Sequence, residues 1–172
     1  MKVTWRKCLL AVIVGCMGVW LCLLWLEQSY EQPYCKVEEG LYIGTSVKRP
    51  PRGTKAVVNL CGQEDPYQVE ASLWEPIFEG GKEPNVEWLS RVVEFIATQR
   101  RAGRPTYVHC LAGMNRSGAV VTAYLMYEHD WGRDAALAFL QEKRPVVQPN
   151  PILMRLLADW EKVLNERKTS RQ

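Results

Sequence analysis

Residues His109–Ser117 combine side chains that suit phosphate chemistry. Cys110 and Arg116 are separated by five residues, between a short apolar run at 105–108 and a longer one at 118–127. This order predicts a strand, a tight loop and a buried helix. The N–H groups of such a loop and the N-terminus of the helix can surround phosphate oxygens. Arg116 would add a bidentate pair of hydrogen bonds, and the Cys110 thiolate would attack phosphorus.

The neighbouring residues are expected to support the same chemistry. A free thiol titrates near pH 8.5, and the loop N–H groups, the helix dipole and Arg116 should lower the pKa of Cys110. We expect His109 to order the loop and to help set that pKa, and Ser117 to donate a hydrogen bond to the departing thiolate. Gly113 allows the backbone to turn with its amides inward. The residues expected to bind phosphate are Leu111, Ala112, Gly113, Met114, Asn115 and Arg116.

Apolar runs and helix caps predict the elements that position this loop. Strands are expected at 40–44, 55–60 and 105–108, and helices at 86–103, 116–128, 134–143 and from Asn150 onward. Residues 61–85 read as irregular, and loops of that length tend to carry function. Strands early and helices late predict one α/β (α+β) domain, with a small central sheet flanked by helices.

Charge and cysteine spacing exclude two functional classes. The chain has 22 basic and 19 acidic residues, and three of the basic ones precede an apolar segment that begins at Cys8. The chain from Glu27 onward is therefore neutral, without the basic stripe of a nucleic-acid binder, so no nucleic-acid partner is expected. The six cysteines show no CxxC or Cys/His ligand spacing. We expect no disulfide framework, no metal site and no cofactor.

Residues 8–26 form an uncharged run of 19 residues. As a helix this run would be about 28 Å long, enough to cross a bilayer. We expect a single-pass N-terminal transmembrane anchor. The alternative is a cleaved signal peptide, although no small-x-small cleavage site follows the run. The basic N-terminus favours a domain outside the cytoplasm, whereas a thiolate survives best in a reducing compartment, so the side of the membrane stays open.

The motif His109-Cys110-x5-Arg116-Ser117 resembles the HCxxGxxRS/T signature of the cysteine-dependent phosphatases. Residues 40–44, 57–60, 75–77 and 144–150 are similar in order and spacing to the dual-specificity branch. The resemblance covers roughly residues 36–165 and favours the compact dual-specificity type. We divide the chain into an anchor or signal peptide (1–26), a linker (27–39), a phosphatase domain (40–165) and a polar tail (166–172).

The resemblance implies a hydrolase that forms a phosphocysteine intermediate on phosphotyrosine, phosphothreonine or phosphoserine proteins. Two alternatives remain open. In the first alternative, the domain is a phosphate-binding adaptor without turnover (a pseudophosphatase). In the second, it is a phosphatase that acts on a phosphoinositide or an RNA 5′-triphosphate. The uncharged residues at 111–115 argue against an inositol lipid, and the neutral domain argues against RNA.

Hydrolysis through a phosphocysteine also requires a general acid, because the leaving oxygen must be protonated. Related enzymes usually supply an Asp from an earlier loop. Here Glu79 occupies the expected place, 31 residues before Cys110. Asp65 and Glu75 are the other candidates.

Overall fold

The predicted loop follows the middle strand of a five-stranded mixed sheet in the order β1-β2-β5-β3-β4. The computed structural model describes residues 32–78 and 80–170. The predicted anchor at 8–26 and the candidate acid Glu79 therefore lie outside the described residues. The strands are β1 (Tyr34–Glu38), β2 (Leu41–Thr45), β3 (Ala56–Asn59), β4 (Ala71–Trp74) and β5 (Thr106–Cys110).

The three inner strands confirm the strand predictions. Every residue of β3 and β5 is buried, as expected for apolar runs inside a parallel sheet. β5 pairs in parallel with β2 on one side and with β3 on the other, and Thr45 is the register partner of Cys110. The last residue of β2 therefore lies beside the start of the predicted phosphate loop.

The two outer strands were not predicted. β1 pairs antiparallel with β2, so the expectation of a linker over 27–39 is wrong for residues 34–38. β4 lies within the stretch 61–85 that reads as irregular, and it pairs in parallel with β3. Both strands are short and half-exposed, with burial that alternates or breaks along the strand. Edge strands with charged or exposed residues carry a weak periodic signal.

Four helices follow the predicted order: α2 (Val86–Arg101), α3 (Arg116–His129), α4 (Arg133–Lys143) and α5 (Pro151–Thr169). Asn85 Oδ1 accepts a hydrogen bond from the Trp88 N–H, and Asn150 Oδ1 accepts one from the Leu153 N–H. Both side chains thus cap their helices. α4 begins one residue before Asp134, after Gly132. The tail prediction for 166–172 is also wrong in part, because α5 continues to Thr169.

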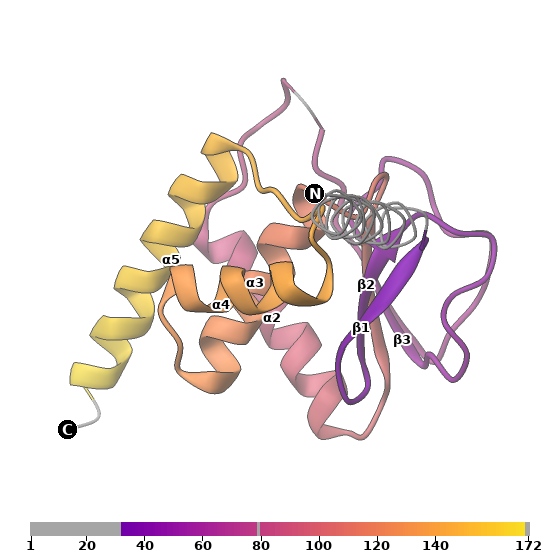
Figure 1. The fold of residues 1–172 in the computed structure, drawn as a ribbon, viewed down its shortest axis with the longest axis horizontal. Coiled ribbons are helices and arrows are strands. Elements are labelled where there is room, and N and C mark those ends of the chain that lie inside the picture. Colours follow the sequence, from indigo (N-terminus) through magenta and orange to yellow (C-terminus); the bar gives the residue numbers. More distant parts are fainter. Residues whose placement is uncertain (1–31, 79, 171–172) are drawn as a thin grey trace, which may run out of the picture. The chain divides into compact units, whose positions relative to one another are not determined.

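The helices α2, α3, α4 and α5 gather on one side of the sheet (Figure 1). α3 is the buried centre of this layer, with nine consecutive fully or nearly fully buried positions after Ser117. The core between sheet and helices includes Val108 and Cys110 of β5. Within residues 32–78 and 80–170, no helix is long and apolar enough to span a membrane.

Candidate active site

Cys110 ends β5 and Arg116 begins α3, so the five residues between them form the predicted strand–loop–helix junction. The Cys110 side chain is buried, and its Sγ lies 3.2 Å from Ser117 Oγ. Burial alone would raise the pKa of this thiol. Hydrogen bonds from the Ser117 hydroxyl and from the backbone N–H groups of Ser117, Met114 and Gly113 outweigh burial, and the pKa of Cys110 is lowered. The loop thus favours a thiolate.

Gly113 is required by the tight path of the loop. Its φ is +66°, a conformation that residues with a Cβ rarely adopt. A Cβ at Gly113 would meet the carbonyl carbon of Gly44 at 2.5 Å and the Thr45 nitrogen at 2.9 Å. The end of β2 therefore leaves room only for glycine at this position of the loop.

The segment after α4 supports the loop from outside. Arg144 is 3% exposed, and its Nε donates a hydrogen bond of 2.9 Å to the Gly113 carbonyl. The Asn150 N–H donates to Asn115 Oδ1 at 2.8 Å, so the Asn115 side chain ties the loop to the start of α5. The sequence did not identify Arg144 as a support. Its only signal was its place at the start of residues 144–150, a stretch that is similar to the dual-specificity branch.

Arg116 joins the loop to two other segments. Its Nη1 donates to the Leu60 carbonyl at 3.1 Å and to the Ile77 carbonyl at 2.9 Å. Leu60 follows β3, and Ile77 belongs to the stretch that leads to residue 79. Nη1 carries only two of the five N–H donors of a guanidinium. The remaining donors suit a bidentate contact with an oxyanion.

A cavity of about 460 Å³ opens directly over the loop. Its lining consists of Cys110, Leu111, Ala112, Met114, Asn115, Arg116 and residues 148–151. A smaller neighbouring cavity is bordered by Phe78 and shares Arg116 with the first. Leu111 and Phe78 are 69% and 61% exposed, so apolar side chains are available beside the buried thiol. The arrangement suits a phosphate group attached to a larger, partly apolar molecule.

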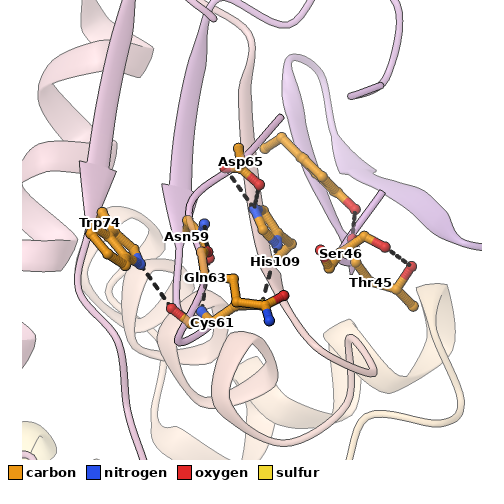
Figure 2. A network of polar contacts seen from close by, with 9 residues as sticks. Thr45, Ser46, Asn59, Cys61, Gln63, Asp65, Trp74 and His109 are labelled. Carbon is orange, nitrogen blue, oxygen red and sulfur yellow. Dashed lines mark hydrogen bonds and ion pairs between the residues drawn. The ribbon is translucent and has the colours of Figure 1, made fainter. Parts of the chain in front are cut away.

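The His109 side chain is directed away from the loop. Successive side chains of a strand point to opposite faces of a sheet, and Cys110 belongs to the core on the helix side. The His109 ring instead contacts Asp65 and Cys61, which follow β3 (Figure 2). The contacts through which His109 would act on the loop are therefore indirect.

The two other candidate acids, Asp65 and Glu75, make polar contacts with other side chains. Both carboxylate oxygens of Asp65 lie 3.1 Å from His109 Nε2. Glu75 Oε2 accepts a hydrogen bond of 3.0 Å from Trp88 Nε1, and its Oε1 lies 3.7 Å from Arg91 Nη2. These contacts orient both carboxylates toward neighbouring side chains.

In the described part of the chain, Cys35, Cys61 and Cys110 are free thiols. No group of three or more His, Cys, Asp or Glu side chains among residues 32–78 and 80–170 is arranged to hold a metal ion.

Comparisons with known proteins agree with this geometry. The family model "Dual specificity phosphatase, catalytic domain" matches residues 52–163. Dual specificity protein phosphatase 1 of Arabidopsis thaliana is 30% identical over 134 residues, which cover 73% of this chain and 68% of that protein. Dual specificity protein phosphatase 16 of Homo sapiens is 35% identical over 104 residues, which cover 60% of this chain but only 16% of that protein. The crystal structure of human DUSP28 superposes with a TM-score of 0.70 and 26% identity, covering 78% of this chain and 96% of that chain.

Proposed function

The chain belongs to the dual specificity phosphatase catalytic-domain family, and from this premise we propose that it hydrolyses phosphate monoesters of phosphorylated proteins. The observation that carries the proposal is the lowered pKa of Cys110 at a loop that also presents Arg116. A thiolate at neutral pH is the nucleophile that such a reaction needs.

The first step is attack by the Cys110 thiolate on phosphorus. The P–S bond forms as the bond to the leaving oxygen breaks, which gives a phosphocysteine and a free alcohol or phenol. Loop N–H groups and the free donors of Arg116 hold the remaining phosphate oxygens, and they act most strongly on the charge that develops in the transition state. The Ile77 and Leu60 carbonyls keep the guanidinium in place while it does so.

In the second step water attacks the phosphocysteine and releases phosphate and the Cys110 thiolate. Ser117 Oγ, at 3.2 Å from the sulfur, donates a hydrogen bond to the thiolate as it departs. Glu79 protonates the leaving oxygen in the first step and accepts a proton from water in the second. Its place in the sequence and the occupied contacts of Asp65 and Glu75 support this assignment.

A phosphoprotein fits the surroundings of the loop better than a polyanionic lipid. Residues 111–115 carry no charge, so beyond Arg116 the loop offers no further cation for additional phosphates. The exposed side chains of Leu111 and Phe78 offer apolar contact to the residue that bears the phosphate.

A substrate panel tests this proposal. The full chain in detergent solution is given phosphotyrosine and phosphothreonine peptides, a phosphoinositide and an RNA 5′-triphosphate, with Cys110→Ser as control. We expect peptide turnover that exceeds the other substrates and disappears in the variant. Wild-type turnover equal to that of Cys110→Ser on every substrate would leave a phosphate-binding adaptor as the function.

We also propose that residues 8–26 anchor the protein in a membrane as a single-pass helix. The uncharged run of 19 residues supports this. Extraction at alkaline pH distinguishes an integral protein from a peripheral one, and N-terminal sequencing of the mature protein distinguishes an anchor from a cleaved signal peptide. An intact N-terminus in the integral membrane fraction is expected. A mature protein that begins after residue 26 would contradict the anchor.

A further inference from the structure

His109 lies in a closed pocket on the face of β5 opposite Cys110. Its side chain is 0% exposed. The ring stacks on Tyr107, which is on the same face, with centroids 5.2 Å apart. Asn59 is the register partner of His109 on the neighbouring strand β3. A polar ring buried this completely needs partners for both nitrogens.

Those partners come from the segment Cys61–Asp65 (Figure 2). Both carboxylate oxygens of Asp65 lie 3.1 Å from Nε2, and Cys61 Sγ lies 3.8 Å from Nδ1. A carboxylate accepts only, so Nε2 must carry a proton. Burial raises the pKa of the Cys61 thiol, and its sulfur lies within hydrogen-bonding distance of Nδ1. The ring is thereby satisfied at both nitrogens and fixed in one orientation.

The segment Cys61–Asp65 is also anchored at its beginning. Asn59 Oδ1 accepts from the Cys61 N–H at 2.8 Å, and Trp74 Nε1 donates to the Cys61 carbonyl at 2.8 Å. At the other end, the side-chain contact of Asp65 with His109 joins the segment to β5. Asp65 is only 13% exposed at its side chain, so its contact with the ring is shielded from water.

The residue directly before this segment, Leu60, contacts both Arg116 and His109. The Leu60 carbonyl accepts from Arg116 Nη1, and the Leu60 N–H donates to the His109 carbonyl at 3.0 Å. Leu60, the residue directly before the segment, therefore contacts both ends of the phosphate loop: the residue before Cys110 and the guanidinium of Arg116. A shift of the segment would move both, and a displacement of about 1 Å at a reacting centre can lower a rate about 100-fold.

We propose that Asp65 is a positioning residue for this site: by accepting from His109 Nε2 it holds the segment Cys61–Asp65 on β5 and so sets the positions of Arg116 and Cys110. Asp65 itself does not touch the substrate and transfers no proton to it. The inference rests on the proposed phosphatase activity, but the binding of an oxyanion tests it separately from turnover.

The test compares Asp65→Ala, Asp65→Asn and Glu64→Ala in the full chain in detergent solution. Glu64→Ala is the matched control, because Glu64 is the exposed neighbour in the same segment. An asparagine can still accept from Nε2, whereas alanine cannot. We expect Asp65→Ala to weaken tungstate binding and to lower kcat/KM, each about 10-fold or more. Asp65→Asn should stay within about threefold of wild type, and Glu64→Ala should equal it.

Leaving groups separate positioning from acid catalysis. Under the positioning role, Asp65→Ala slows activated and unactivated phosphoesters alike. A selective loss on poor leaving groups in Asp65→Asn would make Asp65 the general acid and overturn the proposal. Unchanged tungstate affinity in folded Asp65→Ala would overturn it as well. If the wild-type protein turns over no phosphoester, the proposed phosphatase activity is wrong. The tungstate affinities of the variants would still test the positioning role of Asp65.

A measurement on the wild-type ring covers the case in which Asp65→Ala does not fold. The chain has two histidines, so His129→Gln assigns the imidazole signals in a nitrogen-15 NMR spectrum. A slowly exchanging proton on His109 Nε2 is expected. An unprotonated Nε2 would show that Asp65 does not accept from the ring, and the positioning role would fall.

Discussion

At the scale of single residues, the side chain that contacts the nucleophile is Ser117, whose hydroxyl oxygen lies 3.2 Å from the Cys110 sulfur. Its hydroxyl and its N–H both favour the thiolate. Ser117→Ala should therefore raise the pKa of Cys110, and the rising limb of kcat/KM should move to higher pH. The turnover number should fall about 10-fold or more, as a hydrogen bond to a charged group contributes about 1.5–3 kcal/mol. The pH dependence of iodoacetamide alkylation at Cys110 measures the first effect. An unchanged alkylation profile would remove Ser117 from thiolate stabilisation.

The proposed role of Glu79 as the general acid is tested by varying the leaving group of the substrate. A phenol with strongly electron-withdrawing groups needs little protonation as it departs, whereas a serine or tyrosine oxygen needs much. Glu79→Gln should slow hydrolysis of an unactivated phosphoester about 100-fold or more and that of an activated aryl phosphate much less. Glu83→Gln, four residues further along the chain, is the control. Equal effects of Glu79→Gln on both substrates would exclude it as the acid.

The sequence predicted the placement of the loop residues better than the residues that support the loop. Cys110, Arg116 and Ser117 are recognised from spacing alone, because a strand, loop and helix bring them together locally. His109 shows what local spacing omits. Its partners Asp65 and Cys61 are 44 and 48 residues away, and nothing in the sequence marks them as neighbours.

At the scale of elements, the predicted strands are the interior ones and the missed strands are the two edges of the sheet. β3 and β5 read as apolar runs because all their residues are buried, and β2 is buried at Leu41, Ile43 and Gly44. β1 mixes Lys36 and Glu38 with Cys35 and Val37, and β4 alternates half-buried with exposed positions. Each of these edge strands is stabilised by pairing with one neighbouring strand. That pairing cannot be predicted from the residues of a short polar segment alone.

Because the loop at 111–115 lies so close to β2, the effect of a substitution at Gly113 can be predicted at the same scale. Gly113→Ala places a Cβ within 3.0 Å of three backbone atoms, whereas Gly53→Ala has the same sign of φ but nothing within 4 Å. The left-handed conformation costs each variant about 1–2 kcal/mol. Gly113→Ala should lower the free energy of unfolding by about 1–3 kcal/mol beyond that of Gly53→Ala, because of overpacking.

Urea denaturation measures the difference between the two glycine variants. Gly113→Ala should also weaken phosphate binding, because the added Cβ meets β2 and displaces the backbone N–H that favours the Cys110 thiolate. Equal stability of the two variants would mean that β2 does not constrain the loop.

At the scale of the whole molecule, the boundary of the domain is a testable quantity. By their contacts, residues from Pro33 onward form one unit, so the domain begins before the predicted start at residue 40. A protein of residues 27–172 should fold and keep its activity. A protein of residues 40–172 lacks β1 and its buried Val37, and should be less stable by about 3 kcal/mol or more.

Thermal and urea unfolding of the two truncated proteins measure this difference. Equal stability would show that β1 contributes nothing to the domain. Loss of folding in the 27–172 protein would instead show that the first 26 residues are part of the core.

The central claim is that Cys110 carries the phosphoryl group during turnover. Rapid quenching of the enzyme and a phosphorus-32 aryl phosphate in alkaline denaturant, followed by peptide mapping at alkaline pH, measures it most directly. We predict one label on the peptide that contains Cys110, stable in alkali and lost in acid as expected for a thiol phosphate, more label in Ser117→Ala because the phosphocysteine breaks down more slowly, and none in Cys110→Ser. Turnover in wild type without a label on Cys110, or turnover that persists in Cys110→Ser, would contradict the account.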